Sequence, residues 1–319
     1  MSELFPKISV IGCGNVGMRY TYALMIKGIA RKIVLVDLDT SRLEGEVIDL
    51  SHSTPFTSPV DIIAGDYSDI KDSNLVVITA GKKQKAGQTR LEVAKDNVGL
   101  FKDIIPEIFK YAPSAIYLIV SNPVDILSYA TYVFSKKKPK EVIGSGTVLD
   151  SARFKFLLGK HCKVDPRNVH AYILGEHGDT EVPIWSKAML GGVSLMDYCP
   201  ICENYGKCNR DEELNKIFEE VRDSAYEIIE RKGETSYGIG LSLVRITQAI
   251  LNNENSILPV SSYIDNYLNI SDVYLSLPAV INNEGVRDTL KLELNHEEQK
   301  KLRLSAQTLK NVLKEVGLN

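Results

Sequence analysis

The sequence predicts an α/β protein in which a doubly wound parallel sheet is followed by a second, mixed α/β domain. Short apolar runs alternate with helical patterns through the first 145 residues, as in parallel sheets whose helices cover both faces. A glycine cluster separates the first apolar run from the first helical pattern. The second half carries longer helical patterns and two long strand-like runs, so we expect domains at 1–145 and 146–319.

The individual elements follow from hydrophobic periodicity. In the first half, strands are expected at 7–11, 32–37, 61–64, 74–80, 115–120 and 141–143, and helices at 15–27, 90–111 and 123–135. In the second half, helices are expected at 211–232, 237–251 and 296–316, and strands at 257–264 and 273–281. A further buried strand is predicted at 169–174, because this apolar run ends at a glycine turn signal.

Composition excludes several classes of function. The 319 residues carry a net charge of −3, which gives no reason to expect a nucleic acid or an acidic membrane surface as partner. No apolar run is long enough to span a bilayer, and residues 1–7 do not resemble a signal peptide. Because the five cysteines are an odd number, a disulfide framework is not expected, and we predict a cytoplasmic protein.

A dinucleotide-binding fingerprint opens the chain. Residues 12–17 fit the pattern G-x-G-x-x-G between a predicted strand and a predicted helix. In this arrangement Gly12 allows a tight turn, Gly14 lets a pyrophosphate approach the backbone, and Gly17 permits close packing of helix on strand. Asp37 ends the next strand, where a carboxylate binds ribose hydroxyls and repels a 2′-phosphate. We therefore predict NAD as cofactor; the alternative for Asp37 is a solvated strand end.

A lone histidine follows the apolar run at 169–174. His177 stands in the segment Leu174-Gly175-Glu176-His177-Gly178-Asp179-Thr180, whose small residues leave room for a substrate beside the ring. Histidine is the side chain whose unperturbed pKa lies nearest neutrality, so it suits proton transfer. The alternative is a histidine that merely ends a strand.

With these features the chain resembles the L-lactate/malate dehydrogenase family over essentially its whole length, and within it the bacterial L-lactate dehydrogenases. The motifs that carry the resemblance are residues 12–17, 79–81, 121–125, 149–154 and 175–179. The resemblance implies an NAD-binding Rossmann domain followed by a mixed α/β substrate domain. It implies reversible hydride transfer between NADH and pyruvate, as in glycolysis and fermentation, by a homotetramer or a dimer. Malate dehydrogenase and a non-enzymatic NAD-redox sensor are the alternatives.

The resemblance also assigns catalytic roles. His177 matches the family's proton donor and acceptor, and Asp150 matches the carboxylate that orients it. Arg153 suits bidentate pairing with a substrate carboxylate. Arg90 follows a polar loop with two glycines, which is implied to close as a lid and bring this arginine against the carbonyl oxygen. The alternatives are an N-cap for Asp150, a surface position for Arg153 and a solvated helix start for Arg90.

Further positions match residues that contact substrate or cofactor. The implied substrate-binding residues are Gln84, Arg90, Asn122, Arg153 and Thr235. The implied cofactor-binding residues are Gly12, Gly14, Asn15, Val16, Gly17, Asp37, Thr79, Ala80, Gly81, Lys83, Val120, Asn122 and Ile239. Asn122 precedes a proline and is also a common turn former, and Thr235 is also a candidate helix cap.

Gln84 is the residue that selects the substrate in this interpretation. It stands six positions before Arg90, where the resemblance places the side-chain discriminator. An arginine there would pair with the second carboxylate of oxaloacetate, whereas a neutral glutamine leaves that charge unpaired and favours pyruvate. Lys83 and Lys85 flank it, so a loop shifted by one residue would bring an ammonium group into the pocket.

Two departures from the family pattern leave questions open. His170 matches a histidine that binds the effector fructose 1,6-bisphosphate between subunits in many bacterial relatives, but Lys155 stands where they carry arginine. Whether fructose 1,6-bisphosphate activates the enzyme therefore stays open. If it does, we expect a lower affinity for its phosphate groups, because lysine cannot bind a phosphate in the bidentate manner of arginine. Cys199, Cys202 and Cys208 form C-x2-C-x5-C, but no fourth ligand is evident nearby, so we predict reduced cysteines and no metal.

Overall fold

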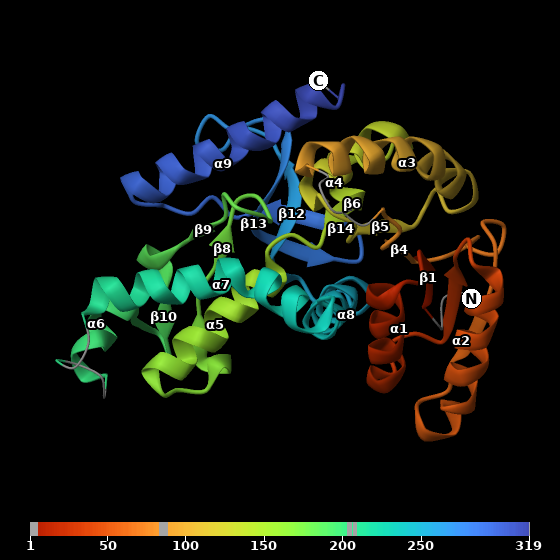
Figure 1. Cartoon of the computed structure of the whole chain (residues 1–319), viewed down its shortest axis with the longest axis horizontal. Coiled ribbons are helices and arrows are strands. Elements are labelled where there is room, and N and C mark those ends of the chain that lie inside the picture. Colours follow the sequence, from red (N-terminus) through yellow and green to blue (C-terminus); the bar gives the residue numbers. More distant parts are fainter. Residues whose placement is uncertain (1–5, 83–88, 203–205, 207–208, 319) are drawn as a thin grey trace.

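The computed structural model describes residues 6–82, 89–202, 206 and 209–318. Within these ranges the chain is organised around one nine-stranded sheet with the order β14-β13-β12-β6-β5-β4-β1-β2-β3. Figure 1 shows α3, α4 and α9 on one side of this sheet, and α1, α2 and α8 on the other. The described helices include none that is long and apolar enough to cross a membrane.

The first half forms the parallel part of the sheet, as predicted. Its strands are β1 (Lys7–Ile11), β2 (Lys32–Val36), β3 (Asp61–Ala64), β4 (Leu75–Ile78), β5 (Ile116–Ile119) and β6 (Val142–Gly144), all paired in parallel. Their order, 3-2-1-4-5-6, is that of the doubly wound dinucleotide-binding fold. The connecting helices are α1 (Asn15–Lys27), α2 (Thr40–His52), α3 (Arg90–Tyr111) and α4 (Val124–Ser135).

Alternating strand residues supply two hydrophobic cores, one on each face of the parallel sheet. Val76 and Ile78 pack on one face with Phe101 of α3. Val77 packs on the opposite face with Leu24 of α1. Strands buried on both faces read as continuous apolar runs, which is why the sequence predicted them well.

The second half extends the same sheet in antiparallel fashion. The strands β12 (Ser256–Ile264), β13 (Val273–Asn282) and β14 (Gly285–Thr289) follow one another, and β12 pairs with β6 through Ser261 and Gly144. The helices are α5 (Val148–Cys162), α6 (Leu195–Tyr198), α7 (Arg210–Lys232), α8 (Tyr237–Leu251) and α9 (His296–Glu315). The sheet therefore crosses the expected division near residue 145, and the domain boundaries stay a prediction.

The expected single strand at 169–174 is wrong. The chain forms two separate short strands there, β7 (Val169–His170) and β8 (Ile173–Leu174). The strand β7 pairs with β10 (Met189–Leu190), which also pairs with β11 (Val193–Ser194), and β8 pairs with β9 (Val182–Pro183). Side chains of α5 and its N-cap bind the backbone of Ile173: its N–H donates to Ser151 Oγ (3.0 Å), and its carbonyl accepts from Thr147 Oγ1 (2.6 Å).

Short 3₁₀ turns complete the described chain. They lie at Thr54–Phe56, Pro139–Glu141, Pro166–Asn168, Trp185–Lys187 and Cys199–Ile201.

Candidate active site

The glycine loop between β1 and α1 has the geometry that a pyrophosphate requires. Gly12 has φ of +91°, and a Cβ there would lie 2.4 Å from the amide nitrogen of Ala80. A Cβ on Gly17 would lie 2.4 Å from the carbonyl oxygen of Gly12, so helix and strand pack closely at this point. A Cβ on Gly14 would meet nothing within 4 Å, so the space above this residue is open. These three environments fit the predicted roles of a tight turn, an open approach and close packing.

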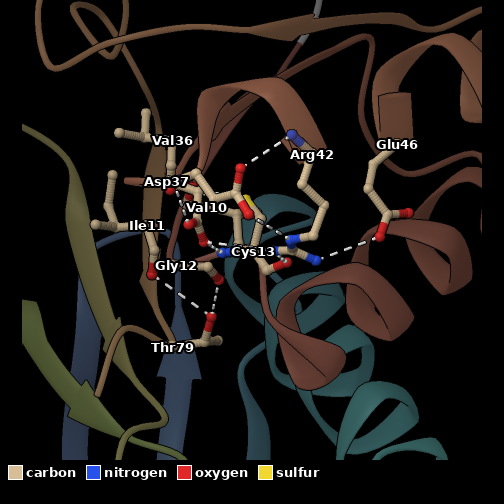
Figure 2. A network of polar contacts seen from close by, with 10 residues as sticks. Val10, Ile11, Gly12, Cys13, Val36, Asp37, Arg42, Glu46 and Thr79 are labelled. Atoms are coloured by element: carbon tan, nitrogen blue, oxygen red, sulfur yellow. Dashed lines mark hydrogen bonds and ion pairs between the residues drawn. The ribbon is translucent and has the colours of Figure 1, made fainter. Parts of the chain in front are cut away.

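Asp37 is held against this loop by hydrogen bonds (Figure 2). Its Oδ2 accepts a hydrogen bond from the amide of Cys13 at 2.6 Å. Arg42 Nη2 lies 3.7 Å from the same oxygen and donates to the carbonyl of Cys13 at 2.7 Å. The Thr79 hydroxyl donates to the carbonyl of Gly12. We call these five residues the dinucleotide cluster; Asp37, 19% exposed in its side chain, is not a freely solvated strand end.

The other predicted cofactor residues gather at the neighbouring strand ends. The amides of Thr79 and Ala80 both donate to the carbonyl of Ile11 at 2.9 Å. Ser121 Oγ donates to the carbonyl of Ala80 at 2.5 Å, which ties the ends of β4 and β5 together. Val16, Val120 and Ile239 are half-buried and pack against the same hydrophobic core, although they come from α1, the end of β5 and α8. Asn15 opens α1.

Asn97 is a site residue that the sequence interpretation missed. It is 1% exposed on α3. Its Nδ2 donates to the carbonyl of Asn122 at 2.9 Å, and its Oδ1 accepts from the amide of Lys82 at 2.7 Å. Asn97 therefore fixes the chain directly after Gly81 to the start of the Asn122-Pro123 segment. A polar residue on the apolar face of an amphipathic helix, between Ala94 and Phe101, was the available signal.

Asp150, Arg153 and His177 converge as the sequence predicted. His177 Nδ1 lies 2.6 Å from Asp150 Oδ2. Arg153 Nη1 donates to Asp150 Oδ1 at 2.9 Å. The Asp150 side chain is 3% exposed and that of Arg153 is 14% exposed, so Arg153 is not a surface residue. The N-cap alternative for Asp150 is wrong, because α5 begins at Val148 and its N-cap is Thr147.

A second buried carboxylate, Asp125, positions the backbone of His177. Asp125 is 2% exposed in the first turn of α4. Its Oδ2 accepts from the amide of His177 at 2.9 Å, and its Oδ1 accepts from Ser261 Oγ at 2.5 Å. The sequence interpretation quoted Asp125 within a motif but gave it no role. We call Asp125, Asp150, Arg153 and His177 the catalytic cluster.

Burial and charge shift the proton equilibria of this cluster. Burial lowers the pKa of His177, but the charge of Asp150 and its hydrogen bond outweigh burial and raise that pKa to about 9. Burial opposes ionisation of Asp150, yet His177 and Arg153 together hold its pKa below the ordinary value. Burial raises the pKa of Asp125 to about 6. His177 is therefore protonated at neutral pH with Nδ1 engaged, which leaves Nε2 as the nitrogen available to a substrate.

The structure describes only some of the remaining residues that were predicted to bind the substrate. Arg90 is the first residue of α3, whose N-cap Thr89 accepts a hydrogen bond from the amide of Glu92. Lys83 and Gln84 lie outside the described residues. Thr235 is half-buried just before α8, and the capping alternative for it is wrong, because the N-cap of α8 is Ser236.

The candidate effector and cysteine positions lie elsewhere. Lys155 Nζ lies 5.9 Å from the centre of the Tyr172 ring, and burial lowers the pKa of its ammonium group. His170 is exposed in β7. Cys199 and Cys202 bracket a 3₁₀ turn, and Cys208 lies outside the described residues. Within the described ranges, no three histidine, cysteine, aspartate or glutamate side chains are placed to hold a metal ion.

Comparison with known proteins identifies the family. Residues 6–144 match the model of the lactate/malate dehydrogenase NAD-binding domain, and residues 147–317 match that of the alpha/beta C-terminal domain. The chain belongs to the lactate/malate dehydrogenase family. It is an NAD-dependent oxidoreductase, and the glycine loop with Asp37 fits that cofactor.

Two L-lactate dehydrogenases are similar in sequence to this chain over almost its whole length. It is 50% identical to L-lactate dehydrogenase 2 of Bacillus anthracis over 98% of this chain and 99% of that protein. It is 47% identical to the L-lactate dehydrogenase of Acetivibrio thermocellus over 99% of each chain. Among solved structures, a minor L-lactate dehydrogenase from Enterococcus mundtii in a ligands-bound form superimposes with a TM-score of 0.93 at 38% identity, covering 99% of both chains.

A second solved structure has the same fold as this chain over almost its full length. A lactate dehydrogenase from a Medee basin deep-sea metagenome library, MGS-M5, has a TM-score of 0.92 at 44% identity and covers 98% of this chain and 99% of that chain. Both structures match the fold across the two halves of the sheet.

Proposed function

We propose that this chain is an L-lactate dehydrogenase, which reduces pyruvate to L-lactate with NADH and runs the reaction in reverse with NAD. The observation that carries the proposal is the chain of contacts from His177 through Asp150 to Arg153. It sets an acid of raised pKa beside a guanidinium in a largely buried site. The names of the relatives, at about half identity over almost the full chain, support lactate rather than malate. The reaction places the enzyme in glycolysis and fermentation.

Each residue of the cluster has a definite task in this reaction. Bound nicotinamide supplies the hydride to the carbonyl carbon or accepts it. The protonated His177 donates from Nε2 to the carbonyl oxygen and recovers the proton in the reverse direction. Asp150 keeps the imidazole in one orientation and stabilises its charged form, while Asp125 holds the histidine backbone. Arg153 binds the substrate carboxylate through its guanidinium.

The role of a lid over the substrate remains a proposal for the residues before α3. Arg90 would polarise the substrate carbonyl and help to exclude water when the loop closes. Lys83 would contact the cofactor, and Gln84 would face the methyl group of pyruvate. Asn97 supports this proposal, because it anchors the start of the loop at Lys82 to the backbone of Asn122.

A comparison of two ketoacids tests the function. Oxidation of NADH is followed at 340 nm with pyruvate and with oxaloacetate, and kcat/KM for pyruvate is expected to be higher by about tenfold or more, because Gln84 leaves the second carboxylate unpaired. Gln84→Arg is expected to move the preference toward oxaloacetate, with Gln88→Arg as a control in the same loop. Comparable kcat/KM values for the two ketoacids in the unmodified enzyme would overturn the assignment.

Assembly into a homotetramer is part of the proposal. Tyr22 and Ile26 on α1 are 50% and 59% exposed, and Tyr237 and Leu241 on α8 are 66% and 56% exposed. Because α1 and α8 pack together, these side chains gather apolar surface on adjoining helices, as at subunit interfaces. Sedimentation equilibrium measures the mass of the particle, and a stable monomer would contradict this part of the proposal.

Activation by fructose 1,6-bisphosphate through Lys155 and His170 stays a prediction. The exposed ring of His170 suits a phosphate, whereas Lys155 is partly buried beside Tyr172. Pyruvate saturation curves with and without the bisphosphate decide the matter, and coincident curves exclude activation. The cytoplasmic location likewise stays a prediction.

A further inference from the structure

One buried carboxyl group beside the catalytic cluster has no part in the reaction as described above. Glu181 lies between the His177 turn and β9, and its amide donates to the carbonyl of Gly178 at 3.2 Å. The residue is 7% exposed. Its Oε1 is fully buried, and none of the described residues donates a hydrogen bond to it. Burying a carboxylate oxygen without a hydrogen-bond donor costs free energy of folding. The burial of Glu181 beside the catalytic cluster therefore needs an explanation.

Four charged groups from three parts of the fold act on Glu181. Asp150 and Arg153 belong to α5, His177 belongs to the turn before β9, and Arg222 belongs to α7. Neither arginine is committed to Glu181: Arg153 Nη1 pairs with Asp150 Oδ1 at 2.9 Å, and Arg222 Nε pairs with Asp223 Oδ1 at 2.8 Å. The negative charge of Asp150 is therefore close by, while no ion pair among the described residues compensates a charge on Glu181.

Glu181 is consequently a proton-binding group near neutral pH. Burial raises the pKa of its carboxyl group, the charge of Asp150 raises it further, and His177, Arg153 and Arg222 oppose the rise, with a result of about 8. The neutral acid predominates at pH 7, and the anion forms just above that range. A buried group that titrates in this range beside other charged side chains is a candidate for a functional role.

We propose that Glu181 is a proton-linked positioning residue: it must be neutral for Arg153 to hold a carboxylate substrate, so ionisation of Glu181 weakens the binding of pyruvate and of L-lactate alike. The inference rests on the proposed function. Substrate binding brings a second anion to a pocket that already contains Asp150, and repulsion between like charges is large where water is excluded. Glu181 acts through Arg153 and the local field, and it takes no proton from the substrate.

The two directions of the reaction separate this effect from that of His177. Pyruvate requires a protonated His177 and L-lactate requires a neutral one, so titration of His177 acts on the two substrates in opposite senses. Both substrates are carboxylates, so titration of Glu181 acts on them in the same sense. A rise of KM for L-lactate with increasing pH, in the range where deprotonation of His177 favours the reaction, is the signature of Glu181.

The first experiment measures KM for L-lactate at saturating NAD from about pH 6 to about pH 10 in the unmodified enzyme and in Glu181→Gln. In the unmodified enzyme KM is expected to rise several-fold above about pH 8. In the Gln variant it should stay flat, while the pH midpoint of kcat that reports His177 moves down only slightly, because Asp150 contributes more than Glu181 to raising that pKa. Glu181→Asp should restore a pH-dependent KM, and Glu220→Gln, at an exposed position on α7, is the matched control.

The second experiment counts protons directly. Calorimetric titration of the NADH complex with oxamate, an unreactive isostere of pyruvate, is done in buffers of different ionisation enthalpy at about pH 8. His177, whose pKa is raised to about 9, is mostly protonated there, whereas the anion of Glu181 is populated in this pH range. The unmodified enzyme should therefore take up more protons on binding oxamate than Glu181→Gln does.

The outcomes are distinct. Equal proton uptake and equal KM profiles in the two proteins would overturn the role of Glu181 while leaving the dehydrogenase activity intact. Absence of turnover with pyruvate and L-lactate in the unmodified enzyme would overturn the proposed function instead. If Glu181→Gln does not fold, proton uptake by the unmodified enzyme decides: a value no larger than His177 alone explains would contradict the inference.

Discussion

The dinucleotide cluster and the catalytic cluster are built by opposite means. The first is held by backbone groups: the amide and carbonyl of Cys13 and the carbonyl of Gly12 bind the side chains of Asp37, Arg42 and Thr79. The second is held chiefly by contacts among charged side chains, with Asp150 between His177 and Arg153, and Asp125 adds one contact with the backbone amide of His177. A site built on backbone conformation follows from a short motif, whereas a site built from buried charges exists only once distant elements have packed.

Burial sharpens this difference. In the dinucleotide cluster the side chain of Arg42 is 41% exposed, whereas in the catalytic cluster that of Asp150 is 3% exposed. Water screens charges in the first cluster and leaves those in the second strongly coupled. Removal of a single charge should therefore disturb the catalytic cluster far more than the dinucleotide cluster, and only the catalytic cluster should respond strongly to pH.

The largest effect is expected for Asp150→Asn. The amide keeps the shape of the side chain but removes the charge that raises the pKa of His177, and it favours the wrong imidazole tautomer. We expect kcat for pyruvate reduction to fall by about 10³- to 10⁴-fold, as for other histidine catalysts deprived of their carboxylate. Rates are measured by stopped flow at saturating pyruvate and NADH.

NADH affinity provides the control for this variant. Fluorescence titration should give an unchanged Kd, because the residues of the dinucleotide cluster make no described contact with Asp150. A similar loss in NADH binding and in kcat would show that the two clusters are not independent.

The next effect in size concerns pH. Because the pKa of His177 is raised to about 9 in the folded protein, kcat for pyruvate reduction should fall by about tenfold per pH unit above that value, and kcat for lactate oxidation should level off there. The raised pKa also stabilises the fold. This contribution is fully present below the ordinary histidine pKa of about 6.5 and is lost as pH rises through about 9.

Thermal unfolding across the same pH range checks the second part. In His177→Gln, which has no titrating ring, the decline of Tm attributable to this group should disappear. A decline of kcat for pyruvate reduction that already begins near the ordinary histidine pKa of about 6.5 would contradict the role of Asp150 in raising the pKa.

The parts of the fold that depend on local sequence were predicted well, whereas the parts that depend on contacts between distant residues were not. The helices α1, α3 and α8 begin and end where periodicity predicted. The helix α2 was not predicted, because Leu43 and Leu50 are its only buried residues and its apolar face is correspondingly weak. The apolar run at 169–174 satisfied the strand pattern, but contacts with Ser151 and Thr147 divide it between two sheets.

The site shows the same limit. The convergence of Asp150, Arg153 and His177 was predicted through motifs that the resemblance made specific. The part played by Asp125 was not, because its contact with the amide of His177 joins residues 52 positions apart. Asn97 was missed for the same reason, since the Asn122 carbonyl that it binds is 25 positions away. Such contacts follow from strand order, which sequence periodicity does not encode.

The smallest effect should come from the glycine loop, where two alanine substitutions separate binding from folding. A methyl group on Gly14 meets nothing within 4 Å, so Gly14→Ala should lower the free energy of unfolding by no more than about 1 kcal/mol, the cost of alanine at a helix N-cap, and weaken NADH binding several-fold by occupying the approach to the backbone. A methyl group on Gly17 would lie 2.4 Å from the carbonyl oxygen of Gly12, so Gly17→Ala should destabilise the fold by about 1–3 kcal/mol. Urea unfolding and NADH fluorescence titration measure the two quantities in each variant. Unchanged NADH affinity in Gly14→Ala would mean that the open space above Gly14 is not a ligand site. In that case the loop would serve packing alone. The dinucleotide cluster could then no longer be contrasted with the catalytic cluster as a binding site built from backbone groups.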